Sequence, residues 1–279
     1  MSRTELFHTQ RTAFLTSYPK IFTDILNASD FFSKAINVSA RYGFEFQPSL
    51  FENQMCIEIE SRYKALNSLI RKHLNNKTLI IELASGLSPR KIEFAHYPYY
   101  EIDLPEIIEI KKEIYKDMNI SCDGLICMDL CDKTILYDLL NEIIENYNDK
   151  DILIVSEGLF WYLKRNDIQG MVDVFKKVFC HSEWKWLTAD CFAQEVFEVD
   201  YRKVIAKSSN KSSIEPFADF DDEFNFFSDN GLTLERYQII ELINTCDVSS
   251  GKFFHISENE IKTRMNNYTD IACLRVTDK

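Results

Sequence analysis

Glycine is scarce in this sequence. Only 7 of the 279 residues are glycine, and the turn LASGLSPR (83–90), which follows an apolar run, contains just Gly86. A dinucleotide site needs several glycines at such a turn, because the backbone must approach a pyrophosphate closely where a helix begins. The turn therefore argues against a cofactor with a pyrophosphate, without excluding one.

Long apolar runs and zinc-binding patterns are also missing. No stretch approaches the roughly 18 uninterrupted apolar residues of a membrane-spanning helix, and the opening MSRTELFHTQRT has no signal-peptide core. The 8 cysteines are scattered, and Cys127 with Cys131 lacks a second pair or nearby histidines. We expect a cytoplasmic protein with reduced cysteines, no metal site and no membrane partner.

Acidic residues outnumber basic residues in this sequence. The sequence has 32 Lys and Arg against 44 Asp and Glu, which gives a net charge of -12. This balance argues against a nucleic acid as partner, because a phosphate backbone is bound through excess basic residues. The one basic cluster, RKVIAKSSNKSS (202–213), is short and rich in serine, and we expect it to be a solvated loop.

An alternation of apolar runs and amphipathic segments begins at Thr78. Such an alternation predicts an α/β fold with a doubly wound, mostly parallel sheet and helices on both faces. Two later apolar segments, 232–240 and 269–277, suit an antiparallel hairpin at the sheet edge, which makes seven strands. The expected strands are 78–84, 97–103, 123–129, 151–157 and 184–190, and the expected helices are 89–96, 105–118, 133–147 and 166–179.

The flanking regions are predicted to be helical. Segments 19–36 and 57–74 carry apolar residues at helical spacing, and 192–207 also has a helical pattern. We expect a single domain over 1–279, in which 1–75 form a helical cap and 76–191 a cofactor-binding half. Residues 192–279 then form a substrate-side helical insertion and the edge hairpin.

Carboxylates follow every expected strand. Ligands of a doubly wound sheet bind outside the carboxyl ends of its strands, so these side chains are expected at one edge, where they repel each other unless donors or a cation separate them. Asp103, 17 residues after Gly86, is placed to accept both hydroxyls of a ribose; alternatively it caps the helix that begins at Pro105. The carboxylates are Glu82, Glu101, Asp103, Asp129, Glu157 and Asp190.

An acidic edge and a turn with one glycine favour S-adenosylmethionine. This cofactor has no phosphate, and it carries an ammonium and a sulfonium that acidic groups attract. Gly86 then supplies the close backbone approach that the cofactor requires.

Four motifs occur in a characteristic order. IELASGLSPR (81–90), YYEIDLPEIIEIKKEIY (99–115), MDLCD (128–132) and SEGLFWYL (156–163) resemble those of the leucine carboxyl methyltransferase family. The similar region spans about residues 57 to 190. The family is a branch of the class I S-adenosylmethionine-dependent methyltransferases, which have a Rossmann-like fold, and it includes bacterial enzymes that methylate small molecules such as polyketides.

The resemblance implies roles for individual residues. The cofactor's methionine part would lie against Gly86, its ribose at Asp103, its adenine at Asp129 and Leu130, and its amino-acid end at Glu157. Glu82 belongs to the same expected cofactor site. Arg62 matches a family arginine near the cofactor carboxylate; alternatively it forms a surface pair with Glu58. Tyr63 and Tyr162 are candidates for the acceptor pocket, with a place in the core as the alternative.

The sequence also departs from the family pattern. Ala84 stands where the family usually has glycine, and Ser88 and Pro89 stand where it has Asp-Thr. The segments that would shape the acceptor pocket match nothing. The family's best-known substrate, the terminal carboxylate of a protein phosphatase, is therefore not expected here, and the acceptor is a small molecule or a peptide.

The acceptor's acidity decides whether a base is needed. A carboxylate is already ionised at neutral pH, whereas a hydroxyl needs a base such as His96, His181 or an edge carboxylate. No histidine lies at an expected strand end, which favours an O-methyltransferase acting on a carboxylate or an acidic hydroxyl. The alternatives are a nicotinamide-dependent oxidoreductase and a non-catalytic S-adenosylmethionine-binding or interaction protein. The oligomeric state stays open.

Overall fold

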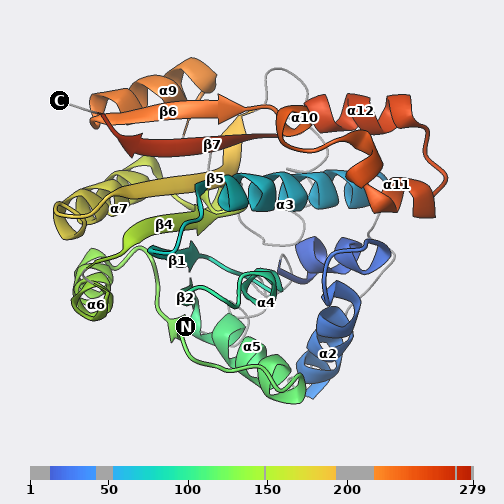
Figure 1. Ribbon diagram of the computed structural model, residues 1–279, viewed down its shortest axis with the longest axis horizontal. Helices are drawn as coiled ribbons and strands as arrows, with labels where there is room; N and C mark the ends of the chain where they lie inside the picture. The colour runs from blue at the N-terminus through green and yellow to red at the C-terminus, as the bar shows by residue number, and fades with distance from the viewer. Residues whose placement is uncertain (1–12, 42–52, 148, 193–216, 268, 278–279) are drawn as a thin grey trace.

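A seven-stranded sheet with strand order β3-β2-β1-β4-β5-β7-β6 forms the centre of the molecule (Figure 1). The computed structural model describes residues 13–41, 53–147, 149–192, 217–267 and 269–277. The strands are β1 (Thr78–Leu83), β2 (Tyr99–Asp103), β3 (Leu125–Cys127), β4 (Asp151–Ser156), β5 (Trp184–Phe192), β6 (Leu232–Tyr237) and β7 (Thr269–Val276).

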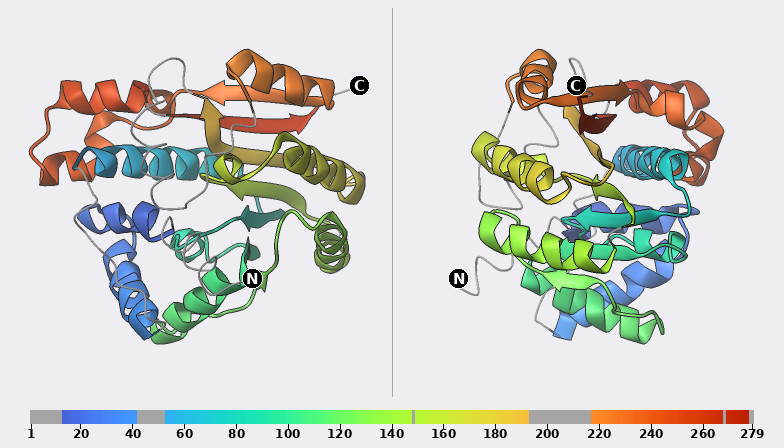
Figure 2. Two further views of the ribbon diagram at one scale, coloured as in Figure 1. Left: turned by 180° about the vertical axis from the view of Figure 1, so that it is seen from behind. Right: turned by 60° about the vertical axis from the view of Figure 1, so that its left-hand side comes forward.

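Helices cover both faces of this sheet (Figure 2). One face carries α3 (Asn53–His73), α4 (Arg90–Glu93) and α5 (Pro105–Asp117), and the other carries α6 (Lys133–Asn146), α7 (Arg165–Val178) and α9 (Phe220–Asp229). The remaining elements are η1 (Tyr18–Phe22), α2 (Ala28–Arg41), η3 (Phe160–Tyr162), α10 (Ile239–Leu242), η4 (Thr245–Asp247), α11 (Ser249–Phe253) and α12 (Glu258–Asn267).

The alternating region folds as the sequence predicts. The pairs β1–β2, β1–β4, β2–β3 and β4–β5 are parallel, and β7 pairs antiparallel with both β5 and β6. All six residues of β1 are buried, as expected for a parallel strand with helices on both sides. The expected α/β, doubly wound, Rossmann-like fold with an edge hairpin is therefore confirmed. The third strand is shorter than predicted, since it covers 125–127 instead of 123–129.

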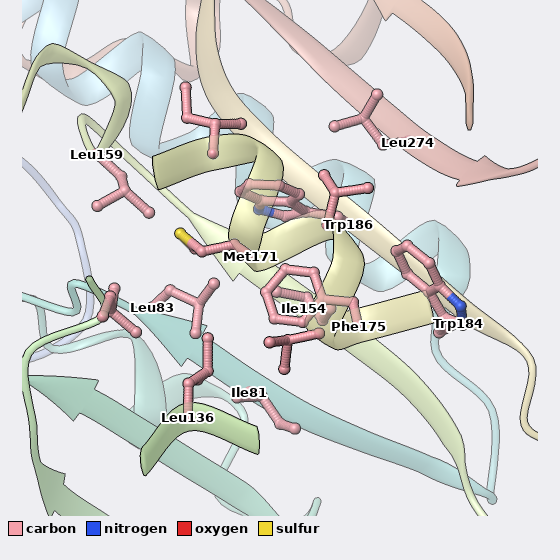
Figure 3. Close-up of a cluster of buried hydrophobic side chains, with 14 of the residues drawn as sticks. Ile81, Leu83, Leu136, Ile154, Leu159, Met171, Phe175, Trp184, Trp186 and Leu274 are labelled. Atoms are coloured by element: carbon pink, nitrogen blue, oxygen red, sulfur yellow. The ribbon is translucent and has the colours of Figure 1, made fainter. Parts of the chain in front are cut away.

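The larger apolar core lies between the sheet and helices α6, α7 and α9 (Figure 3). In this core, the Phe175 ring of α7 meets the Trp186 ring of β5 edge to face, with centroids 5.5 Å apart. A second cluster packs α3 and α10–α12 against the opposite face. Because β1 and β4 alternate apolar residues to both cores, their carboxyl ends are held in place from two sides.

The expected helix over 19–36 is wrong. The structure has a short 3-10 helix, η1, and then α2 from residue 28, with a break at 23–27 between them. Two features interrupt the helix: Thr23 is extended and donates from its N–H and its hydroxyl to the Lys20 carbonyl, and Asn27 has a φ of 59°. The expected helix over 192–207 and the basic segment 202–213 lie outside the described residues, apart from Phe192 at the end of β5.

Two kinds of feature are absent from the described residues. None of their helices combines the length and the apolar character needed to cross a bilayer. In the same part of the chain, no group of three or more histidine, cysteine or acidic side chains is arranged to hold a metal ion.

The turn after β1 has an unusual backbone. Ala84 has a φ of 49° and Gly86 a φ of 50°, so both residues are in the left-handed region. Glycine adopts this conformation freely, whereas alanine is strained in it. The glycine that the family usually has at the position of Ala84 is thus explained by backbone geometry.

We expect Ala84→Gly to raise the free energy of unfolding by up to about 1 kcal/mol. Relief of the left-handed strain, about 1–2 kcal/mol, exceeds the entropy that glycine adds to the unfolded chain, about 0.4–1 kcal/mol. Ala84→Val, with a β-branched side chain, should lower stability. Urea unfolding of the three proteins checks this; a loss of stability in Ala84→Gly would contradict the strain at this position.

Phe175→Ala should lower the free energy of unfolding by about 3–5 kcal/mol, because it leaves a cavity in the larger core. The matched control is Phe253→Ala, since Phe253 is 59% exposed, and it should change stability by less than about 0.5 kcal/mol. Equal effects of the two substitutions in urea unfolding would show that this core does not hold the sheet.

Candidate functional site

Two polar groups lie at the carboxyl ends of β1, β2 and β4. The first is the turn that follows β1 together with Asp103, and we name it the Asp103 turn. The second, named the charged cluster, contains Lys20, Arg62, Glu82, Arg90 and Glu157, all of them almost fully buried. These elements meet because parallel strands end at the same edge of the sheet.

Asp103 and Gly86, both predicted site residues, are in direct contact. The Gly86 N–H donates to Asp103 Oδ2 at 2.6 Å, and the Leu104 N–H donates to Oδ1 at 2.7 Å. A carboxylate has about four acceptor positions, so each oxygen keeps one for another donor. Asp103 does not cap α5 through its side chain, since Leu104 is the capping residue of that helix.

Most backbone donors of the turn are already engaged within the protein. Besides Gly86, the N–H of Ser85 donates to the Ile102 carbonyl at 3.4 Å and the N–H of Ser88 to the Ser85 carbonyl at 3.2 Å. Arg90 N–H donates to Ser88 Oγ at 3.3 Å, and Pro89 has no N–H. The turn thus presents a carboxylate where a pyrophosphate site would present free amide donors.

The Arg90 guanidinium is at the centre of the charged cluster. It bonds to Glu82 at the end of β1, to Glu157 Oε2 at 2.5 Å after β4, and to Asn67 Oδ1 on α3 at 2.6 Å. Tyr99 OH on β2 donates to the other Glu82 oxygen at 2.9 Å. The Arg90 side chain therefore connects β1, the end of β4 and α3 directly, and Tyr99 of β2 joins the cluster through Glu82.

Arg62 and Glu157 form the outer pair of the cluster. Arg62 Nε donates to Glu157 Oε1 at 3.0 Å, and their side chains are only 4% and 9% exposed. The alternative of a surface pair with Glu58 is wrong, because Arg62 is buried. Glu58 itself meets Arg264 at 3.2 Å. The structure thus brings Arg62 and Glu157, two of the residues singled out by the resemblance, into direct contact.

Lys20 of η1 completes the charged cluster, although no sequence signal singled it out. The residue is 4% exposed, and its ammonium lies 5.0 Å from the centre of the Tyr63 ring. Within the part of the chain that the structure describes, this ammonium donates no hydrogen bond. A largely buried ammonium without a protein acceptor is costly, which points to an anionic ligand.

The electrostatics of the cluster favour a further anion. Among the described residues that form it, three cations meet two carboxylates. Burial lowers the pKa of Lys20 to about 8, with Glu157 opposing and Arg90 and Arg62 reinforcing the shift. Burial would raise the pKa of Glu157, but Arg62, Lys20 and Arg90 outweigh it and hold that pKa well below the usual range. Burial also raises the pKa of Glu82, against the effect of Arg90.

Asp103 is ionised less readily than an ordinary carboxyl group. Burial raises its pKa to about 6, and the donors Gly86 and Leu104 limit the shift. The Lys111 ammonium also lowers this pKa, whereas Glu82 raises it. Asp103 is thus mostly ionised at neutral pH and protonated in mild acid.

The two tyrosines occupy different environments. Tyr63 is 1% exposed and lies between two cations, with Arg90 4.5 Å and Lys20 5.0 Å from its ring centre. Its position favours a structural role. Tyr162, in η3 after β4, is 40% exposed.

The expected adenine residues lie beyond β3. Asp129 is exposed and accepts from the Cys131 N–H at 2.9 Å, whereas Leu130 is buried. They stand on the segment that follows β3, and β3 lies beside β2, the strand that ends at Asp103. Asp129 and Leu130 therefore follow the strand that lies beside the one ending at Asp103.

Two of the strand-end carboxylates make their direct contacts outside the Asp103 turn and the charged cluster, although the Arg62 charge still acts on Asp190. Glu101 is fully buried and pairs with Lys111, with 2.6 Å between Oε1 and Nζ. Asp190 lies toward the α7 face, where it accepts from Thr188 Oγ1 at 2.7 Å and from the Phe160 N–H at 3.3 Å. Side chains alternate along a strand, so residues near one edge still point to opposite faces.

The two candidate histidine bases lie elsewhere. His96 precedes β2 and His181 precedes β5, so both are at the amino ends of their strands, and both are exposed. Across the part of the chain that the structure describes, no histidine follows the carboxyl end of β1, β2, β4 or β5 directly.

The two groups together fit an amino acid joined to a nucleoside. Lys20 and Arg62 suit a carboxylate, Glu157 suits an ammonium, and the open acceptor positions of Asp103 suit the two hydroxyls of a ribose. These features match the chemical groups of S-adenosylmethionine.

Several solved structures are similar to this chain at low identity. An O-methyltransferase family protein from Burkholderia thailandensis shares 9% identity with a TM-score of 0.45; the match covers 81% of this chain and only 60% of that protein. The magnesium protoporphyrin IX methyltransferase of Synechocystis, solved with bound SAH, shares 10% identity with a TM-score of 0.47, covering 93% and 99%. A methyltransferase from Streptomyces caelestis shares 9% identity with a TM-score of 0.42, covering 77% and 90%. No curated protein matches the chain.

The family comparison is more specific. The model of the leucine carboxyl methyltransferase family matches residues 17–176, more than half of the chain. This range contains the whole charged cluster and the Asp103 turn. It also contains η1 with Lys20, which precedes the first motif found by resemblance. The chain therefore belongs to the leucine carboxyl methyltransferase family, whose members are methyltransferases that use S-adenosylmethionine.

Proposed function

We propose that this protein is an S-adenosylmethionine-dependent O-methyltransferase. The observation that carries the proposal is the Lys20 ammonium, which is buried beside Arg62 and Arg90 and has no acceptor among the described residues. Such a site binds a carboxylate strongly, because charge-assisted hydrogen bonds gain strength where water is excluded. The cofactor supplies an electrophilic methyl group on a sulfonium when it is bound.

The charged cluster would hold the amino-acid end of the cofactor. Lys20 and Arg62 would bind its carboxylate, and Glu157 would face its ammonium. Glu82 would act through Arg90, which it orients by an ion pair. Arg90 in turn donates to Glu157, so the cluster would be aligned before the ligand arrives.

The Asp103 turn would hold the nucleoside. Asp103 would accept the two ribose hydroxyls, and Gly86 would let the backbone lie against the methionine part. Asp129 and Leu130 would bind the adenine, the first as a hydrogen-bond acceptor and the second as an apolar wall. Support for this placement comes from the contact between Gly86 and Asp103 and from the open lone pairs of Asp103.

A nicotinamide-dependent oxidoreductase fits less well. That cofactor has a pyrophosphate, which needs free amide donors at the first turn. The N–H groups of Ser85, Gly86, Ser88 and Arg90 are already donated to protein acceptors. The Asp103 carboxylate beside Gly86 would also repel a phosphate.

The acceptor is proposed to be a carboxylate or an acidic hydroxyl of a small molecule or a peptide. An acceptor of this kind is ionised at neutral pH and needs no general base. This agrees with the exposed positions of His96 and His181 at the amino ends of their strands. Tyr162, exposed after β4, would line the acceptor pocket, whereas the buried Tyr63 would separate Lys20 from Arg90.

We further propose a single domain with three parts. Residues 1–75 would cover the cofactor, 76–191 would bind it, and 192–279 would shape the acceptor side. The contribution of η1 to the charged cluster supports the role of the first part. A cytoplasmic location is supported by the cysteines, since all seven whose side chains the structure describes are free thiols.

The cofactor proposal predicts a specific pattern of binding. Calorimetry should detect S-adenosylmethionine and S-adenosylhomocysteine, with little affinity for NAD or NADH. Asp103→Ala should weaken binding at least about tenfold, through the loss of charge-assisted hydrogen bonds. Gly86→Val should abolish it, because valine at a φ of 50° displaces the backbone from Asp103.

Three outcomes separate the candidates. Binding of NADH in preference to S-adenosylhomocysteine would favour the oxidoreductase and contradict the proposal. Binding that Asp103→Ala leaves unchanged would contradict the assigned site. Cofactor binding without methyl transfer to any of a panel of carboxylic acids, acidic phenols and peptides would favour a non-catalytic binding protein.

A pH titration isolates the role of Lys20. Its pKa of about 8 in the free protein means that the ammonium loses its charge as the pH rises through that value. The affinity for S-adenosylhomocysteine should therefore fall above about pH 8 in the wild type, and the fall should be clearly smaller for Lys20→Arg, because arginine stays protonated.

The groups that face Lys20 are Glu157, Arg90, Arg62 and Glu82. The neighbouring cations hold the pKa of Glu157 well below its usual range, and Glu82 and Glu157 hold the pKa of Arg90 above its own against the effect of burial, so neither changes its charge as the pH rises through about 8. Any titration of Glu82 affects both proteins. The amino group of the ligand titrates equally with both proteins, so the difference between the two curves belongs to Lys20. Identical curves for wild type and Lys20→Arg would exclude Lys20 from the cofactor site.

A further inference from the structure

A buried ion pair lies directly beneath the Asp103 turn. Lys111 of α5 and Glu101 of β2 are both fully buried, and Lys111 Nζ is 2.6 Å from Glu101 Oε1. The second oxygen of Glu101 accepts from Tyr115 OH at 2.7 Å. Both residues lie within the motif 99–115 that carries the resemblance, but none of the roles proposed above includes this pair.

The Lys111 ammonium also contacts the turn itself. It donates to Ser85 Oγ at 3.0 Å and to the Ser85 carbonyl at 3.4 Å. The ammonium thus forms an ion pair with one carboxylate and hydrogen bonds to two oxygens of Ser85, the residue that precedes Gly86. A lysine from one helix thereby fixes the backbone at the point where that backbone bonds to Asp103.

Stability alone gives little reason for such a pair. Two charges removed from water lose hydration energy that their mutual attraction only partly restores, and apolar residues of similar size often replace them without loss. The pair therefore has an effect that apolar residues would not supply: it orients Ser85 and places a positive charge near Asp103, whose pKa it lowers.

We propose that Lys111, held by Glu101, is a positioning residue that fixes the Ser85–Gly86 turn and the ionised Asp103 carboxylate in the arrangement that binds the cofactor. This role rests on the proposed function, since it concerns the same cofactor site. Lys111 does not touch the cofactor; it acts through Ser85 and through its charge.

The test removes the pair as a unit. Lys111→Met with Glu101→Gln eliminates both charges, retains side-chain volume and keeps an acceptor for Tyr115. This double variant should fold, with a melting temperature close to that of the wild type. Its affinity for S-adenosylhomocysteine at neutral pH should fall at least about tenfold, because the turn is no longer fixed and Asp103 is protonated more readily.

The pH profile distinguishes positioning from a merely structural role. In the wild type, affinity should fall as the pH drops through about 6, where Asp103 takes up a proton. The charged groups that influence Asp103 are Lys111 on α5 and Glu82 on β1. Without Lys111, this decline should begin at a higher pH, which a general loosening of the fold would not produce.

A matched control is the pair Arg236–Asp270 of the β6–β7 hairpin. Arg236→Met with Asp270→Asn also removes a largely buried ion pair, but far along the sheet from the Asp103 turn. It should leave both the affinity and the pH profile unchanged. If the Lys111 double variant does not fold, Ser85→Ala replaces it: this change removes one acceptor of Lys111 and should weaken binding about three- to tenfold.

The outcomes are distinct. The role of Lys111 is overturned if the folded double variant, or Ser85→Ala, binds S-adenosylhomocysteine as tightly as the wild type and loses affinity at the same acidic pH. The proposed function then stays intact. A wild type that does not bind S-adenosylhomocysteine overturns the proposed function and this role together.

Discussion

The Arg90 guanidinium is the interaction on which the rest of the site depends. It joins Glu82 of β1, Glu157 after β4 and Asn67 of α3 in a region without solvent. A buried guanidinium is tolerated only where several acceptors surround it. These acceptors come from the strand ends and from α3, so the fold must bring the elements together before the charge is satisfied, and Glu157 is thereby aimed at the ligand.

The two halves of the site have opposite electrostatic characters. The charged cluster has an excess of positive charge among its described residues, and Lys20 is its least satisfied member. The Asp103 turn presents a carboxylate, with its backbone donors turned inward. An amino acid linked to a nucleoside complements both halves, whereas a pyrophosphate would meet Asp103 where it needs donors. In this account, the single glycine of the turn reflects a cofactor without phosphate.

Local patterns in the sequence predict the fold well and the site in part. The alternation of apolar runs places β1, β2, β4 and β5 and the helices between them, because each is encoded by neighbouring residues. Lys20 escapes prediction because it belongs to a short 3-10 helix that reaches the site only through tertiary packing. The face on which Asp190 lies depends on how β5 aligns with β4, which the sequence of one strand does not reveal. Arg62 could be assigned by resemblance, but its partner Glu157 lies 95 positions away.

The central claim is that Lys20 and its neighbours recognise the amino-acid end of the cofactor, while Asp103 recognises the ribose. Calorimetry with two ligands tests it most directly: S-adenosylhomocysteine, and 5′-methylthioadenosine, which keeps the nucleoside and lacks the amino acid. The account predicts that Lys20→Met weakens binding of the first ligand at least about tenfold and leaves the second unchanged. Equal losses for both ligands, or no loss for S-adenosylhomocysteine, would contradict it.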